Sequence, residues 1–330
     1  MLARFLKKDD RTARARDVLS VSFVVIVYDM QQQAENTIRS LLPGYQLGVS
    51  GDEYEVIVVE NASANTMRRE FLQSLPANVR YFLRENPETS PAKAINFGAE
   101  QARGENICVI IDGARMLTPG VVRTILMGHR LSDSAVVAIP GYHLGRELQQ
   151  EAVNSGYSLE QERALLDSIA WPEAGYRLFD IACFSGSSAP GLFMPNSESN
   201  CISIPRDIWR GLGGYDERFN LRGGGLINLD LYKRACEYPG VQHIIAPGEG
   251  TFHQFHGGVT TGGQSREKRE AYIEQSKAQY RELRGEEFVS PRSQPLYLGE
   301  IPEQAQKFVH YSASRVLLAR GESPLTHGPA

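Results

Sequence analysis

Apolar blocks alternate with polar, helix-like stretches through the first 140 residues of the chain. Residues 21–28, 53–61 and 105–111 are nearly continuous apolar runs rich in β-branched side chains. Such runs are typical of strands covered on both faces of a parallel sheet. Residues 34–42 place apolar side chains at helical spacing, and residues 121–139 combine another helix with a further strand. This alternation predicts an α/β fold, a mostly parallel twisted sheet with helices on both faces.

Composition and charge exclude several classes of protein. A net charge of −4 over 330 residues argues against a nucleic-acid binder, because counterion-driven binding needs a basic face. The four cysteines lack Cys-x-x-Cys spacing, which indicates reduced thiols and a cytoplasmic location. No apolar run has the length of a transmembrane segment, and the start of the chain lacks the apolar core of a signal peptide.

An acidic residue, Asp112, follows directly after the apolar run 105–111. Ligands of open α/β sheets bind outside the carboxyl ends of the strands, so this carboxylate is a candidate for contact with a ligand. An acid that merely starts a turn is the alternative interpretation.

Several segments carry a family resemblance when they are taken in order. They read VSFVVIVYD, EVIVVENAS, AINFGAEQARGENICVIIDGA and IPRDIWRGLGGYDERF. This series resembles the family-2 glycosyltransferases of the GT-A fold, over roughly residues 20–260, and ordered landmarks are more specific than any one motif. The resemblance implies a nucleotide-diphospho-sugar donor, with a UDP-sugar as first choice, and usually a divalent metal held by an Asp-x-Asp motif. The implied acceptor is a glycan, a lipid-linked glycan or a small polar molecule.

The resemblance and the composition together divide the chain into three parts. A basic arm is expected over residues 1–19, a transferase domain over 20–262, and a C-terminal helical extension over 263–330. Within the domain, residues 20–140 form the expected donor half and residues 141–262 the acceptor half. The two helices expected in the extension have narrow apolar stripes, which suits either a cap on the domain or a homodimer contact.

The resemblance also implies which residues contact the donor. Tyr28 and Asp29 match the pair near the donor base, and Glu60 matches the acid that accepts a hydrogen bond from the uracil ring. A carboxylate can accept from an imide N–H, while a tyrosine offers a stacking face. Lys93 and Asn96 occupy the helix that approaches the base and the diphosphate. A solvated helix charge is the alternative for Lys93.

The metal motif departs from the family pattern. Asp112 falls on its first position, but the motif reads Asp112-Gly113-Ala114, so the last carboxylate is missing. Arg115 follows and can neutralise a departing diphosphate through bidentate hydrogen bonds. We therefore expect Mn²⁺ or Mg²⁺ to be weakly bound or dispensable. His256, which two glycines follow, fits the family's histidine better than His253, so Asp112 and His256 are the predicted metal ligands.

The catalytic base is a second departure from the family. The family's Glu-Asp pair becomes Ile227-Asn228 here, and an amide does not take up a proton at neutral pH. Either Asp230 or Glu198 acts as base from a shifted position, or transfer proceeds without a protein base, or activity has been lost. Asp230 also suits an ion pair with Arg234 on the same helix face.

Two other functions remain open at this level. The joint departures at the metal and base motifs favour a scaffold protein that binds a nucleotide sugar without transferring it. A nucleotidyltransferase is less consistent with the sequence, because residues 29–36 hold no glycine for a phosphate-binding loop.

Overall fold

The computed structural model describes residues 19–85, 88–257 and 265–324. The basic arm predicted over residues 1–19 lies outside them except for its last residue. The main feature is an eight-stranded sheet with strand order β12-β10-β6-β9-β4-β1-β2-β3. Its strands are β1 (Val21–Val27), β2 (Tyr54–Asn61), β3 (Val79–Arg84), β4 (Asn106–Ile110), β6 (Ala135–Ala138), β9 (Cys201–Pro205), β10 (Gln242–Ile245) and β12 (Leu296–Tyr297).

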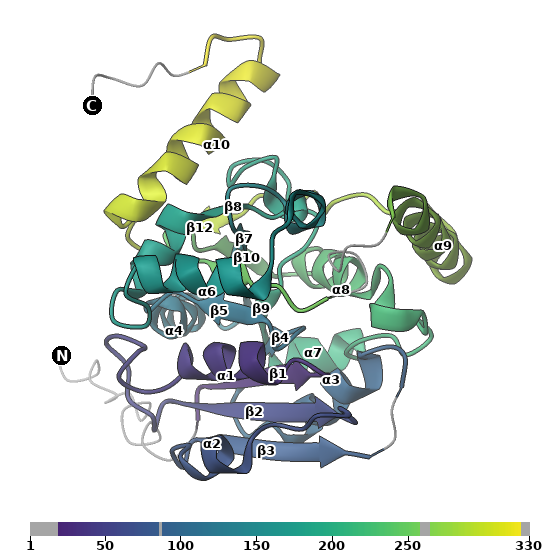
Figure 1. Cartoon of the computed structure of the whole chain (residues 1–330). Helices are drawn as coiled ribbons and strands as arrows, with labels where there is room; N and C mark the ends of the chain where they lie inside the picture. The colour runs from purple at the N-terminus through teal and green to yellow at the C-terminus, as the bar shows by residue number, and fades with distance from the viewer. Residues whose placement is uncertain (1–18, 86–87, 258–264, 325–330) are drawn as a thin grey trace, which may run out of the picture.

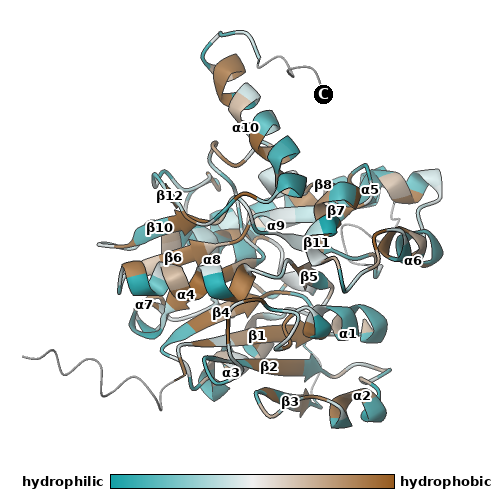
Figure 2. Cartoon of the chain, turned by 90° about the vertical axis from the view of Figure 1, so that its left-hand side faces the viewer, coloured by the Kyte–Doolittle hydropathy of each residue, from teal (hydrophilic) through white to brown (hydrophobic). Residues whose placement is uncertain are grey.

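Most neighbouring strands of this sheet are parallel, as the apolar pattern predicts. Only β9 runs antiparallel to its two neighbours, β4 and β6. Side chains of β1 alternate between two hydrophobic clusters, with Phe23 and Val25 on one face and Val24 and Ile26 on the other. Figure 2 shows hydrophobic residues concentrated in the central strands. The α/β fold with a mostly parallel sheet is confirmed.

Helices cover both faces of the main sheet (Figure 1). One face carries α1 (Gln31–Arg39), α2 (Arg69–Gln73) and α4 (Val121–Leu131). The other face carries α3 (Ala92–Gln101), α7 (Arg206–Leu212) and α8 (Ile227–Cys236). A tight turn forms at the end of α7, where Gly213 and Gly214 adopt φ angles of 72° and 65° that other residues rarely tolerate.

A second sheet of four short strands lies beside the main one, and the sequence pattern did not predict it. Its order is β5-β11-β7-β8, formed by β5 (Arg115–Leu117), β11 (Thr251–His253), β7 (Gly141–Leu144) and β8 (Ala182–Phe184). Tyr142 stacks on Phe184 and Phe252 at ring distances of 5.1 Å each. In this sheet His253 pairs with Arg115 on one side and His143 on the other.

The region after residue 145 contains the helices that its polar pattern predicts. They are α5 (Gln149–Ala152) and α6 (Leu159–Ser168), and Ser158 caps α6 by accepting a hydrogen bond from the Gln161 N–H. Short 3₁₀ turns complete the described chain at Val153–Ser155, Gly175–Ile181, Gly186–Ser188, Arg222–Gly224 and Glu303–Ala305.

Two helices dominate the C-terminal part of the chain. The first, α9 (Arg266–Arg284), begins at the Ser265 cap and ends at Gly285, and α10 (Gln306–Ala319) projects from the body at the top of Figure 1. Between them, β12 joins the edge of the main sheet by pairing with β10. Within the described ranges, no helix is long and apolar enough to cross a membrane.

Candidate functional site

A cavity of about 1050 Å³ opens at the carboxyl ends of β1, β2 and β4. This is the position that the sheet topology predicts for a ligand site. Loops that follow these strands form one wall, and residues of α8 and α9 form the opposite wall. The polar residues of the lining include Tyr28, Asp29, Asn61, Glu88, Asp112, Arg115, His143, Glu198, Asn200, Arg222, Asn228, His253, His256, Arg269 and Tyr272.

Three side chains in this cavity form a potential metal site. Donor atoms of Asp112, His253 and His256 all lie within 4.8 Å of one another. The Nε2 atoms of the two histidines are 3.1 Å apart. Two nitrogens that each sit about 2.1 Å from one cation are separated by roughly 3.0–3.4 Å, so this spacing fits ligation of a single ion. The structure thus adds His253 to the predicted ligand pair of Asp112 and His256.

Backbone and side-chain contacts hold the turn that carries Asp112. Thr37 of α1 is fully buried, and its hydroxyl donates to the Gly113 carbonyl at 2.7 Å while accepting from the Arg115 N–H at 2.9 Å. Asp112 Oδ1 accepts from the Ala114 N–H at 3.0 Å. The turn after β4 is therefore fixed by α1, which places the carboxylate at the cavity wall.

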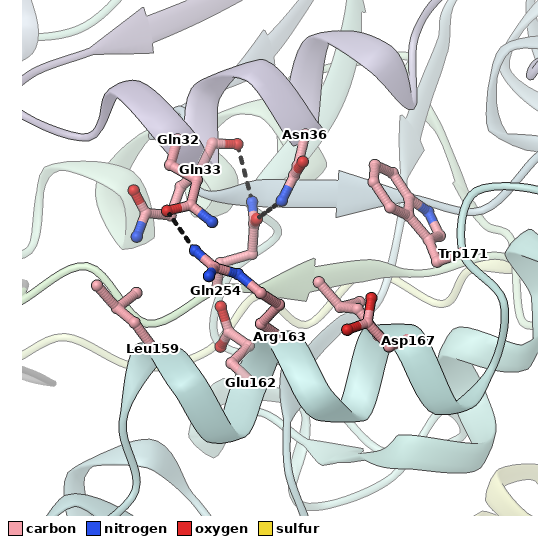
Figure 3. Close-up of a pocket in the computed structure, with 10 residues that line it drawn as sticks. Gln32, Gln33, Asn36, Leu159, Glu162, Arg163, Asp167, Trp171 and Gln254 are labelled. Atoms are coloured by element: carbon pink, nitrogen blue, oxygen red, sulfur yellow. Dashed lines mark hydrogen bonds between the residues drawn. The ribbon is translucent and has the colours of Figure 1, made fainter.

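The segment 253–256 is attached to the same helix. Gln254 donates through Nε2 to the Gln33 carbonyl at 3.0 Å and accepts at Oε1 from Asn36 at 3.0 Å. Figure 3 shows Gln254 between α1 and α6, in a smaller second cavity that these helices border. Because α1 holds both the 112–115 turn and this segment, the three potential metal ligands share one support.

An ion pair lies beside the potential metal site. Arg115 Nε donates to Asp112 Oδ2 at 3.0 Å. Burial alone would raise the pKa of Asp112, but the positive charge of Arg115, with a smaller effect of His256, holds it below its usual value. Arg115 Nη1 is buried and lacks a hydrogen-bond partner within the described chain. A buried donor of this kind suits an anionic ligand.

Burial favours the neutral form of the histidines in the site. It lowers the pKa of His143 to about 3 and lowers the pKa values of both His253 and His256. Arg115 adds to the effect in each case, while Asp112 opposes it at His143 and His256. Neutral imidazole is the form that binds a metal ion, so the chemistry of these donors favours a ligand role over a contact with diphosphate.

Asn228, at the position of the implied base motif, contacts a carboxylate that lines the cavity. Asn228 donates through Nδ2 to Glu198 Oε2 at 2.7 Å and accepts at Oδ1 from the Tyr215 hydroxyl at 2.8 Å. The second Glu198 oxygen has no hydrogen-bond partner among the described residues. Asn228 thus orients Glu198 instead of accepting a proton itself.

Asp230, the other candidate base, lies away from the cavity. Its side chain is 1% exposed and accepts hydrogen bonds from Arg234 at 2.8 Å and from Arg284 at 2.6 Å. Arg284, which belongs to α9, also pairs with Asp216 at 2.9 Å. The ion pair with Arg234 is the one that the sequence suggested as the alternative. Through these ion pairs Asp230 joins α9 to α8. Because its oxygens bind guanidinium groups and it does not line the cavity, Asp230 is poorly placed to deprotonate an acceptor.

An Asp230→Asn variant is therefore expected to lose stability while its fold and donor site persist. Removing one member of a buried ion-pair network leaves uncompensated charge and costs about 3 kcal/mol. Urea unfolding should show this loss, whereas Asp207→Asn, at an exposed pair with Arg210, should change stability by less than about 0.5 kcal/mol. An unchanged unfolding midpoint for Asp230→Asn would contradict the structural role.

Two of the residues predicted to contact the donor base lie in the cavity wall. Tyr28 is 45% exposed and Asp29 lies beside it, and both line the cavity. Glu60, in contrast, is fully buried and accepts from the Tyr81 hydroxyl at 2.5 Å and from the Met67 N–H at 3.0 Å. Its neighbour Asn61 lines the cavity instead, because successive strand residues face opposite sides.

The two residues predicted on α3 have structural contacts. Lys93 is half exposed and forms an ion pair with Glu88 at 3.0 Å, and it does not line the cavity although Glu88 does. Asn96 accepts from the Tyr215 N–H at 3.0 Å and donates to the Tyr215 carbonyl at 2.9 Å. Asn96 thus holds the turn after α7 and also lies outside the lining.

Comparisons with known proteins identify the family. None of the curated proteins matches the chain in sequence. S. aureus TarS 1–349, solved in complex with UDP-GlcNAc, is 14% identical over 92% of this chain and 74% of that chain, with a TM-score of 0.47. The mannosyltransferase PcManGT from Pyrobaculum calidifontis, solved with GDP-Man and Mn²⁺, is 14% identical over 93% of this chain and 77% of the mannosyltransferase chain, with a TM-score of 0.48. The model of glycosyltransferase-like family 2 matches residues 22–245, more than half of the chain. The chain therefore belongs to glycosyltransferase-like family 2.

Proposed function

We propose that the protein transfers a sugar from a nucleotide-diphospho-sugar donor, with a UDP-sugar as first choice, to a hydroxyl of a glycan, a lipid-linked glycan or a small polar acceptor. The observation that carries this proposal is the cluster of Asp112, His253 and His256 next to Arg115, in one cavity at the ends of the sheet strands. The family to which the chain belongs supports the reaction class.

The donor would lie with its base near Tyr28 and its diphosphate near Arg115. The exposed ring of Tyr28 offers a stacking face, and Asn61 offers an amide that can donate and accept hydrogen bonds to the base. Arg115 Nη1 would donate to a diphosphate oxygen, because it is buried without a partner among the described residues while Nε pairs with Asp112.

Asp112, His253 and His256 would hold a divalent cation. Three protein donors leave coordination positions for diphosphate oxygens, and two imidazoles with one carboxylate favour Mn²⁺ over Mg²⁺. When bound, the ion would supply positive charge to the leaving diphosphate. This revises the expectation of a dispensable metal, since the second histidine replaces the carboxylate that Ala114 lacks.

Glu198 would accept the proton of the acceptor hydroxyl. Its free oxygen and the Asn228 amide lie in the acceptor half of the cavity wall, where α9 contributes Arg269 and Tyr272. Asn228 holds the carboxylate in place, so the base would act from the position of Glu198 and not from the family's usual position.

A thermal-shift panel of nucleotide sugars tests the donor and the metal together. A UDP-sugar at a hundredfold excess over its Kd should stabilise the protein by about 2.7 kcal/mol. The shift should be larger with Mn²⁺ than with Mg²⁺ and should shrink in excess chelator. Stabilisation by no nucleotide sugar under any condition would contradict the proposal.

A scaffold protein is the second candidate, favoured by the replacement of the base motif with Ile227-Asn228. Release of UDP from the donor identified by the panel separates the two. Slow release of UDP without acceptor supports the enzyme, and tight binding with no release supports the scaffold.

A further inference from the structure

We propose that Gln149 is a positioning residue for His253, held in its own orientation by Glu162. It fixes the His253 ring so that the Nε2 lone pair points toward Asp112 and His256. This inference rests on the proposed function only in that the three residues form the metal site. The orientation of the ring can be measured without metal, donor or acceptor.

Gln149 makes three hydrogen bonds to histidines of the site. It is fully buried on α5, and its Oε1 lies 2.5 Å from His253 Nδ1. Its Nε2 donates to the His253 carbonyl at 2.8 Å, and its backbone N–H donates to His143 Nδ1 at 3.1 Å. One side chain therefore contacts both the ring and the backbone of His253.

The partners of the Gln149 amide determine which atom faces the ring. Its NH₂ group faces two acceptors, the His253 carbonyl and Glu162 Oε2 at 3.5 Å, so its oxygen must face Nδ1. An oxygen there requires that Nδ1 carry the proton. A neutral imidazole carries one ring proton, so Nε2 is left with a lone pair. That Nε2 is the atom 3.1 Å from His256 Nε2.

Glu162 connects this amide to the rest of the segment 253–256. It is 4% exposed on α6, and its Oε2 accepts from the Phe255 N–H at 2.8 Å and from the Tyr157 hydroxyl at 3.1 Å. From the opposite side, Gln33 of α1 donates to the Phe255 carbonyl at 2.7 Å. Figure 3 shows Glu162 on α6 and Gln33 on α1 facing each other across Gln254.

These contacts give the region after residue 145 a role at the metal site. The sequence placed it on the acceptor side, but Gln149 contacts the potential metal ligand His253 directly, and Glu162 holds the backbone of Phe255, the neighbour of His256. Groups that hold a ligating imidazole through its other nitrogen commonly contribute about 10–100-fold to metal affinity. We expect the same range for Gln149.

The test is ¹⁵N NMR of histidine-labelled, metal-free protein, combined with Mn²⁺ titration. In the parent protein, His253 should show a protonated Nδ1 and an unprotonated Nε2. A Gln149→Leu variant should lose this preference and bind Mn²⁺ about 10–100-fold more weakly. The double variant Gln149→Glu with Glu162→Gln keeps an acceptor oxygen for His253 Nδ1 and a hydrogen bond between positions 149 and 162, although it loses the donor to the His253 carbonyl. It should retain the Nδ1–H form.

Gln32→Leu is the matched control, because Gln32 borders the small cavity that Glu162 also lines but does not contact a histidine among the described residues. It should leave both readouts unchanged. An Nε2–H form of His253 in the parent protein, or an unchanged form in Gln149→Leu, would overturn the inference. Failure of the proposed function is distinguishable, since it would appear as absent donor binding while the NMR result for Gln149 still held.

Discussion

Replacing Asp112 by asparagine is expected to lower kcat for UDP release from the donor by about 10³-fold. The change removes the one anionic ligand of the Asp112, His253 and His256 cluster and takes the carboxylate partner from Arg115. Both effects weaken charge neutralisation at the leaving diphosphate. Steady-state assays across a Mn²⁺ series should show the loss, with a higher Mn²⁺ concentration needed for half-maximal rate.

Asp29→Asn serves as the control for this variant. Asp29 also lines the cavity, but it accepts from the Ala64 and Asn65 N–H groups, which an amide oxygen can replace. It should keep kcat within about threefold, as expected for a change worth less than 0.7 kcal/mol. Full activity of Asp112→Asn without added metal would place charge neutralisation on Arg115 alone.

Glu198→Gln is expected to lower kcat for sugar transfer by about 10²–10⁴-fold while leaving donor affinity unchanged. The glutamine keeps an oxygen for the Asn228 amide, so the local structure should persist, but it no longer accepts a proton. Donor affinity measured by thermal shift separates this loss from a binding defect.

The matched control for Glu198 is Glu88→Gln, a second carboxylate of the cavity wall that pairs with Lys93. It should leave kcat nearly unchanged. A fully active Glu198→Gln variant would favour transfer without a dedicated protein base, the mechanism that the sequence left open.

The sequence predicts the main sheet well because a run of apolar residues that are adjacent in the chain marks each of its central strands. Continuous apolar runs such as residues 21–28 report burial on both faces, and the structure places them in central strands. The second sheet gave no such signal. Two of its strands, Arg115–Leu117 and Thr251–His253, are three residues long and pair with each other although more than 100 residues separate them in the chain.

Residues of the site differ in the same way: some can be predicted from the neighbouring sequence, and others have contacts with residues far away in the chain. Asp112 could be predicted because it follows a recognisable strand. The positions of Glu60 and Asn61 could not, since motif alignment does not fix which of two adjacent strand residues faces the ligand. For Asp230 the sequence offered both a catalytic role and an ion pair with Arg234, and its second partner, Arg284, lies 54 residues later. The contact of Gln149 with His253 joins residues 104 positions apart, so no local pattern indicates it.

The short strand β12 has a consequence for how far the folding unit extends. The family match ends at residue 245, yet residues Leu296–Tyr297 pair with β10 and cover its outer side. A chain shortened to the matched region would leave that backbone without its partner. Uncovered strand edges recruit other molecules, so such a fragment would tend to self-associate into aggregates, and the last quarter of the sequence protects the sheet that holds the site.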